Sequence, residues 1–166
     1  MALLKIGEKP IQSFNDETCA AQLARTLFDN VTDALLSSHP WRFATKKYDL
    51  VRTGDDDFLI PTDVVRVLSS SAPKYEINGN RIVAAGEKIS VACTARIGVE
   101  NYPAYFSSVA AIKLAMEFCM PLTDNSGAFN ILAALFESEM RAAKFIDSST
   151  SIAPDVKDFS LISARF

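Results

Sequence analysis

The stretch His39–Leu50, HPWRFATKKYDL, marks the place where the sequence pattern changes from helical to extended. Pro40 has a fixed φ and disfavours helical geometry at the residue before it, so a helix that arrives here must end. Trp41 and Phe43 can then anchor the turn in the core, while the residues that follow begin a strand. We interpret His39, Pro40, Trp41 and Phe43 as a structural corner that joins a helix to a sheet.

The segment before the corner has the pattern of a long amphipathic helix. Apolar residues recur at the 3.6-residue period between residues 20 and 35, and Asn15 or Asp16 precedes them as a cap. Further upstream, Gly7 and Pro10 follow the apolar run ALLKI, which predicts the end of a first helix.

Strand patterns follow the corner. Lys46–Val51 suits a strand, and four further segments have the composition of strands: Val64–Leu68, Lys74–Ile77, Arg81–Ala85 and Ile89–Ile97. The dipeptide Asn78-Gly79 lies between the second and the third, and it tolerates the positive φ of a tight hairpin turn. We expect a small antiparallel meander in the middle of the chain.

Helical patterns return after residue 100. The segment Asn101–Pro121 is apolar nearly all round, which predicts the most buried helix, and Pro121 is expected to close it. A further apolar stripe consists of Phe129, Leu132, Phe136, Met140 and Ala143. These blocks predict an α+β fold, an antiparallel helical bundle with a small antiparallel β-sheet inserted between the first long helix and the final helix pair.

The end of the chain is set apart by its composition. Residues 147–166 open with a Ser/Thr-rich run and Pro154, and then carry large apolar side chains with no partner segment downstream. A disordered tail seldom contains so many, so we expect an extended arm that lies on another surface, in its own subunit or a neighbour. The chain then consists of a single domain, residues 1–146, and this arm. The candidate interface residues of the arm are Ile152, Phe159, Leu161, Ile162 and Phe166.

Composition narrows the class of protein. The chain has 166 residues, 49% of them hydrophobic, and a formal net charge of -3. These values favour one folded domain and argue against a protein that grips nucleic acid through clustered cations. Cys19, Cys93 and Cys119 form no CxxC pair, so we expect three small buried hydrophobic side chains rather than a disulfide framework or a zinc site. No segment reaches the roughly 20 continuous apolar residues of a membrane span, and no membrane association is expected.

Catalytic signatures are scarce. No GxSxG, P-loop, HExxH or GxGxxG motif occurs, and the single histidine, His39, suits a helix end better than general base catalysis. We expect no catalytic, metal or cofactor site. One alternative is a small enzyme or ligand-binding domain with a pocket between the sheet and the final helices, holding His39 or Tyr102. Another is a nucleic-acid-binding module that uses Arg42, Lys46 and Lys47.

Taken in series, these elements resemble the tail tubular protein A family, the head-to-tail adaptors of short-tailed bacteriophages. The resemblance rests on ALLKIGEKPIQSF near the N-terminus, the aromatic corner HPWRFA, the segments IPTDVVRVL and YEINGNRIVA, and the aromatic-led helix pair. It covers residues 2–143. Family members usually carry a fuller first helix before the ALxxIGE element, inside which this chain begins.

The resemblance implies a structural virion protein without enzymatic activity. Such an adaptor forms a ring of twelve copies under the portal, extends the DNA channel and docks the tail nozzle. Its partners would be the portal protein, the nozzle protein and further copies of itself, with DNA passing through the channel without specific binding. It would be made in the host cytoplasm and would lie at the head–tail interface of the virion, away from any membrane and without a cofactor. The weakly negative net charge fits a DNA conduit, because a lumen that attracted phosphate would slow the passage of DNA.

Overall fold

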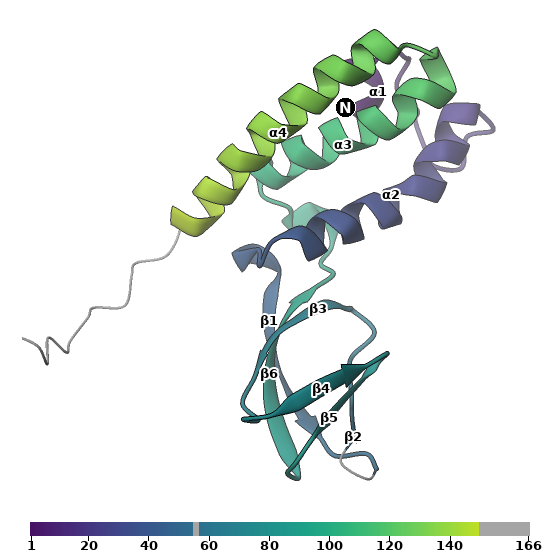
Figure 1. Cartoon of the computed structure of the whole chain (residues 1–166). Helices are drawn as coiled ribbons and strands as arrows, with labels where there is room; N and C mark the ends of the chain where they lie inside the picture. The colour runs from purple at the N-terminus through teal and green to yellow at the C-terminus, as the bar shows by residue number, and fades with distance from the viewer. Residues whose placement is uncertain (55–56, 150–166) are drawn as a thin grey trace, which may run out of the picture.

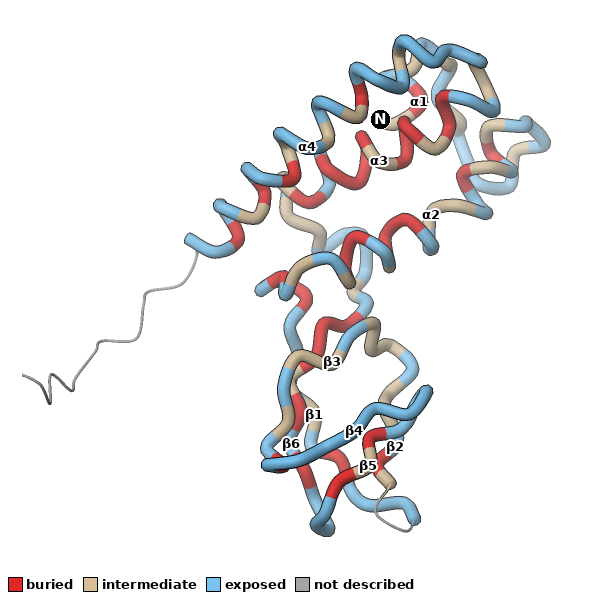
Figure 2. The backbone as a smooth tube through the Cα atoms, viewed as in Figure 1, coloured by how far each residue is buried: buried red, intermediate tan, exposed pale blue. Residues whose placement is uncertain are grey.

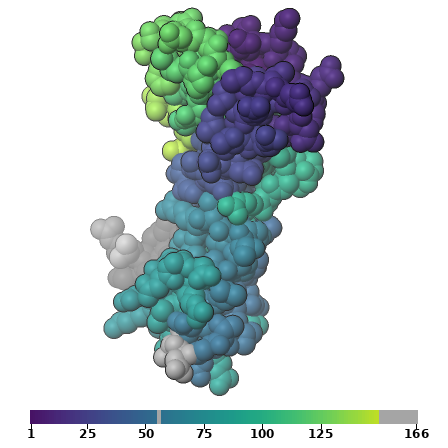
Figure 3. Space-filling model, turned by 90° about the vertical axis from the view of Figure 1, so that its right-hand side faces the viewer, coloured from purple at the N-terminus to yellow at the C-terminus, as the bar shows by residue number. Residues whose placement is uncertain are grey.

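The computed structural model describes residues 1–54 and 57–149, which form a helical lobe and a β lobe (Figure 1). The space-filling view shows the two lobes at opposite ends of an elongated molecule (Figure 3). The helical lobe contains α1 (Ala2–Lys5), α2 (Cys19–Ser38), α3 (Ala104–Thr123) and α4 (Ser126–Ser149). Two 3-10 turns, η1 (Arg42–Ala44) and η2 (Val99–Asn101), stand where the chain passes between the lobes. The expected α+β class is confirmed.

Helix α2 begins two or three residues later than the sequence suggests. Thr18 is its cap, and the Thr18 hydroxyl accepts a hydrogen bond from the backbone N–H of Ala21 at 3.2 Å. The carboxylate of Asp16, one of the two expected caps, instead accepts a hydrogen bond from the Gln12 N–H at 2.9 Å and so closes a turn before the helix. A side chain that can bond either forward or backward gives an ambiguous capping signal. The helix ends at His39, whose backbone is extended as Pro40 requires.

Helix α3 is the centre of the helical lobe, where it lies between α2 and α4 with about half of its residues buried (Figure 2). It does not stop at Pro121, as expected, but continues to Thr123. Its end is set by Asp124, which has a positive φ of 46° and whose N–H donates to the carbonyl of Met120 at 3.1 Å. A proline in a last turn removes only one of the helical hydrogen bonds, so it does not force an immediate stop.

Among the described residues, α3 is also the one helix that is long and apolar enough to cross a membrane, although half of the relevant stretch is buried inside the protein. The sequence did not suggest such a segment, because Lys113 and Glu117 interrupt its run of apolar residues. The two side chains form an ion pair at 2.7 Å, which lowers the cost of placing charges on this helix. Burial of the apolar face is what the central helix of a folded domain requires.

Helix α4 packs against α3 through its inner face. Leu132, Met140 and Ala143 of the expected stripe are buried, Phe136 is partly buried against them, and Phe129 is exposed. The helix continues to Ser149, so residues 147–149, which were expected in the arm, belong to α4. Five candidate interface residues lie outside the described residues: Ile152, Phe159, Leu161, Ile162 and Phe166.

The β lobe consists of two antiparallel three-stranded sheets rather than one meander. The first has the strand order β1-β6-β3 and the second β2-β5-β4. Their bounds are β1 (Thr45–Val51), β2 (Asp57–Leu59), β3 (Val64–Ser70), β4 (Tyr75–Asn78), β5 (Arg81–Ala84) and β6 (Lys88–Ala95). The expected hairpin forms between β4 and β5, with Gly79 at a φ of +60°. Strand β2 was missed because three residues are too few to give a periodic pattern.

Each lobe has its own hydrophobic core, and polar contacts join the two. The guanidinium of Arg96, just after β6, forms two hydrogen bonds with the carboxylate of Asp33 on α2, at 2.8 and 2.5 Å. Arg66 on β3 donates to the backbone carbonyl of Ser37 near the end of α2 at 2.9 Å. Val65, between these contacts, packs against the helical core. The lobes are therefore fastened at the C-terminal end of α2, next to the corner.

Two of the three cysteines fit the expectation of buried hydrophobic side chains. Cys93 and Cys119 are buried, but Cys19 is exposed at the first position of α2. The expectation for Cys19 was wrong: its side chain lies on the exposed side of the first turn of α2, whereas Ala21 in the same turn is buried.

Candidate functional site: the corner cluster and two apolar surfaces

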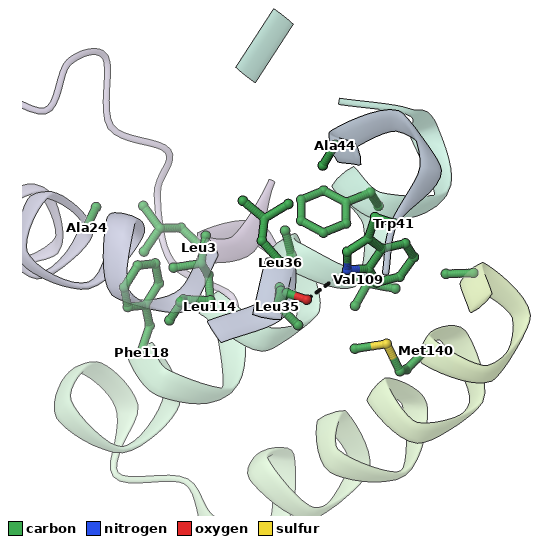
Figure 4. Packing of buried hydrophobic residues seen from close by; sticks show 14 residues of the cluster. Leu3, Ala24, Leu35, Leu36, Trp41, Ala44, Val109, Leu114, Phe118 and Met140 are labelled. Atoms are coloured by element: carbon green, nitrogen blue, oxygen red, sulfur yellow. Dashed lines mark hydrogen bonds between the residues drawn. The ribbon is translucent and has the colours of Figure 1, made fainter. Parts of the chain in front are cut away.

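Trp41 is fully buried at the corner, where it joins α2 to α3. Its indole Nε1–H donates to the carbonyl of Leu35 at 2.8 Å (Figure 4). The ring lies edge-on to Phe106 on α3 with centroids 5.2 Å apart, and Phe43 packs beside both rings at 5.9 and 4.9 Å. A buried indole whose only donor is satisfied fixes the direction in which the chain leaves the helix.

Asp147, near the C-terminal end of α4, is a buried carboxylate that the sequence does not reveal. It accepts hydrogen bonds from the backbone N–H of Arg42 at 3.1 and 3.2 Å and from the Tyr105 hydroxyl at 2.9 Å. His39 Nε2 lies 3.4 Å from the same carboxylate. We call Asp147 with these three partners the corner cluster. It ties α4 to η1 and to the start of α3 by hydrogen bonds, and His39 at the end of α2 contacts the same carboxylate.

The corner cluster contains side chains of the kinds that perform acid–base catalysis, but its contacts link structural elements to one another. Burial, followed by the hydrogen bond to Asp147, raises the pKa of Tyr105 to about 12, so its phenol remains a donor at neutral pH. The ring of His39 stands edge-on to Trp41 with centroids 4.8 Å apart, and its side chain is only 19% exposed. Each of these polar groups therefore has a partner within the fold.

The structure does not form the ligand pocket or the nucleic-acid surface in the way that the two alternative functions proposed. Tyr102 lines a groove within the helical lobe, and a second hollow, of about 600 Å³, is lined by β-lobe residues such as Leu59 and Val67. His39 lines neither of them, and neither hollow lies between the sheet and the final helices, where the pocket was expected.

The cations proposed for nucleic acid are also separated. Lys46 and Lys47 are adjacent on β1, where successive side chains point to opposite faces. Lys46 pairs with Asp63 at 3.2 Å, which neutralises its charge locally. The Tyr48 hydroxyl donates to the same carboxylate at 2.6 Å. A contiguous basic strip for phosphates is therefore not formed by this part of the sheet.

The groove that Tyr102 lines is apolar and holds about 280 Å³. We call it the N-terminal groove, because α1 and the segment before α2 form one wall and α2 with α3 form the other. Its lining includes Met1, Leu3, Ile11, Phe14, Phe28 and Phe118. For comparison, a cavity of about 150 Å³ suffices for benzene, so this groove can accept about two groups of that size.

A second apolar surface lies on the side of α4 that faces away from α3. It contains Ile131, Leu135, Ser138, Ala142 and Phe145, all exposed, and we call it the outer stripe. The residues are four and three apart in turn, a spacing that keeps them on one side of the helix. Phe145 and Ile131 are 74% and 71% exposed, although both are large apolar side chains. Figure 2 shows this side of α4 as exposed.

Metal ligation has no support in residues 1–54 and 57–149, where no group of three or more His, Cys, Asp or Glu side chains is close enough to hold an ion.

The comparison with protein families gives a match to the family model described as "Tail tubular protein", over residues 1–146. The match includes both lobes and the outer stripe. No curated protein matches the chain.

Proposed function

We propose that this protein, a structural protein of a phage tail, is a head-to-tail adaptor. The proposal follows from the family to which the chain belongs, the tail tubular protein family. The protein assembles as a ring of twelve copies under the portal, extends the DNA channel and docks the tail nozzle. The observation that carries the proposal is the family match, which spans all but the last 20 of the 166 residues. The protein acts by contact and catalyses no reaction.

The exposed apolar surfaces support an assembly role. A folded monomer seldom leaves a groove and a helix face uncovered on one lobe unless other chains cover them. The N-terminal groove and the outer stripe together place such surface on α1, α2, α3 and α4. The polar groups that could perform acid–base chemistry, by contrast, are engaged in the corner cluster.

In this proposal, the C-terminal residues add further apolar contact surface. Ile152, Phe159, Leu161, Ile162 and Phe166 follow directly after α4, whose end Asp147 fastens to the corner. They contact the portal, the nozzle or a neighbouring copy in the assembled tail, at the entropic cost of ordering an arm. DNA passes through the channel without specific binding, in keeping with the net charge of -3. Synthesis takes place in the host cytoplasm, and the protein functions in the virion.

Native mass spectrometry of the chain mixed with portal rings from the same phage tests the adaptor role. We expect a complex in which copies of this chain are added to the portal ring, and the added mass gives their number. A matched variant that ends at Ser149 keeps every described element and removes only the C-terminal residues. It should bind the portal less well if those residues supply contact area. Persistent absence of a complex between the full chain and the portal would remove the proposal.

A further inference from the structure

We propose that the charge on His39 controls how firmly the C-terminal end of α4 is held, so that the corner cluster tightens as the pH falls. The inference concerns this chain alone and does not depend on the adaptor role. It starts from one contact, the 3.4 Å approach of His39 Nε2 to the carboxylate of Asp147.

Asp147 is the group on which this contact acts. Its side chain is 2% exposed, and it accepts hydrogen bonds from the Arg42 backbone N–H and from the Tyr105 hydroxyl. Both donors are neutral, so neither compensates the negative charge of a carboxylate that is removed from water. Among the described residues, the basic side chain paired with this carboxylate is His39.

His39 stands where a positive charge is attracted from two sides. It is the residue at which α2 ends, and the helix dipole attracts a cation at a C-terminal end. The Asp147 carboxylate lies on its other side, and the ring packs edge-on against Trp41 with centroids 4.8 Å apart. The His39 side chain is also 19% exposed, so the ring can exchange a proton with water.

The strength of the contact between His39 and Asp147 depends on the charge of the ring. A charged imidazolium attracts the buried carboxylate, because little water screens the pair, whereas a neutral ring offers only a weak dipole. Imidazoles change their charge between about pH 5 and 8. The attraction is therefore complete at the acidic end of this range and is lost as the pH rises through it.

The other charged or titratable groups around the corner keep their charge over this range. Arg66 of β3 bonds to the end of α2, Arg42 of η1 has an exposed side chain, and Lys144 of α4 lies half-buried about one turn before Asp147. Lysine and arginine side chains stay charged well above pH 8, so they form a constant background. Tyr105 of α3 stays neutral, since its pKa is about 12. His39 is the single histidine of the chain.

The element that responds is the last turn of α4. Asp147 lies two residues before Ser149, at which the helix ends, and the residues that include Ile152 follow directly. A helix end opens more readily when it has few partners in the fold. A charged His39 therefore fixes the point from which residues 150–166 leave α4, and a neutral His39 loosens it.

Hydrogen exchange of the full chain, detected by NMR at pH 5.5 and pH 8, tests the inference. Protection is expressed relative to the exchange of a free peptide at the same pH. We expect the amides of residues 145–149 to be about fivefold more protected at pH 5.5 than at pH 8. His39→Gln keeps a polar side chain that cannot become charged, and Asp147→Asn keeps an acceptor but removes the negative charge. Each variant should show equal protection at the two pH values.

Tyr105→Phe is the matched control, because it removes one hydrogen bond from Asp147 and leaves the ion pair intact. It should keep the pH dependence, and a loss of the dependence in this variant would count against the ion pair. Equal protection at both pH values in the native chain would overturn the inference, as would a dependence that survives His39→Gln. That variant changes a partly exposed side chain, so it decides the matter even if Asp147→Asn does not fold. A dependence that vanishes in His39→Gln but persists in Asp147→Asn would show that His39 acts through the end of α2 alone, which would also overturn it.

Discussion

The helical lobe and the β lobe each contain a tyrosine hydroxyl that donates to an aspartate, yet the two pairs lie in different surroundings. In the helical lobe, Tyr105 bonds to Asp147, whose side chain is 2% exposed. In the β lobe, Tyr48 bonds to Asp63, whose side chain is 40% exposed. A carboxylate removed from water must obtain every partner from the fold, whereas an exposed one can use water instead. The comparison predicts that the helical lobe depends on its polar cluster and that the β lobe does not.

The largest effect is expected at Trp41, whose ring packs beside the corner cluster. Trp41→Ala removes a fully buried ring and should lower the free energy of unfolding by about 3–5 kcal/mol. Urea denaturation followed by far-UV circular dichroism measures the change without relying on tryptophan fluorescence. Tyr75→Ala in the β lobe, where the ring is 37% exposed, should change the same quantity much less. An unchanged urea midpoint for Trp41→Ala would show that the ring does not hold the corner.

The second largest loss of stability is expected for the corner cluster itself. Asp147→Ala leaves the Arg42 N–H and the Tyr105 hydroxyl without their acceptor, and we expect a loss of about 2–3 kcal/mol. The matched change in the β lobe, Asp63→Ala, removes a half-exposed acceptor and should cost less than about 1 kcal/mol. The same urea experiment compares them. Equal losses of stability for Asp147→Ala and Asp63→Ala would show that the buried carboxylate contributes no more than the exposed one.

The buried carboxylate also shows where sequence reasoning stops. Asp147 was assigned to a tail, because its partners lie 105 and 42 residues away and one of them is a backbone N–H. Nothing in the local sequence marks such an acceptor. The end of α2 was predictable, since Pro40 signals a helix end and the helix runs to Ser38.

Other features divide in the same way between local and long-range causes. The hairpin at Gly79 and the central helix α3 follow from short-range patterns, and both were predicted. The pairing of β2 with β5, and the place of β6 between β1 and β3, arise from contacts between distant segments. The N-terminal groove is formed by parts of α1, α2 and α3, so it has no signature in any one of them. The outer stripe, by contrast, lies within one helix, and its spacing could have been read from the sequence.

High pH should weaken both tyrosine–aspartate pairs. Burial, with the aspartate bond second, raises the pKa of Tyr105 and of Tyr48 from 10.0 to about 12. Folding thus favours the neutral phenols, so their contribution is complete below pH 10 and is lost as the pH rises through about 12. Urea midpoints measured between pH 9 and 12 should fall, and Tyr105→Phe and Tyr48→Phe should each reduce the slope. A slope that neither substitution alters would mean that other groups cause the loss.

The polar contacts that join the two lobes should contribute less to stability than the corner cluster does. Arg96→Ala removes the two hydrogen bonds to Asp33, and because the arginine side chain is 54% exposed we expect a loss of about 0.5–1 kcal/mol. Hydrogen exchange should become faster near the end of α2 and near Arg96, while amides in the two cores keep their protection. Faster exchange throughout one lobe would instead show that the lobes fold as one unit.

The smallest effect on stability is expected where the helical lobe exposes apolar side chains. Ile131→Gln replaces a residue that is 71% exposed by another good helix former, and the free energy of unfolding should change by less than about 0.5 kcal/mol. Val51→Thr is the matched change in the β lobe, where the side chain is 65% exposed, and it should be equally neutral. Sedimentation velocity at high protein concentration separates the two. Ile131→Gln should reduce self-association, because Ile131 belongs to the outer stripe, and Val51→Thr should not. If both variants associated as the native chain does, the apolar surface of α4 would have no more part in assembly than an isolated exposed valine on a strand.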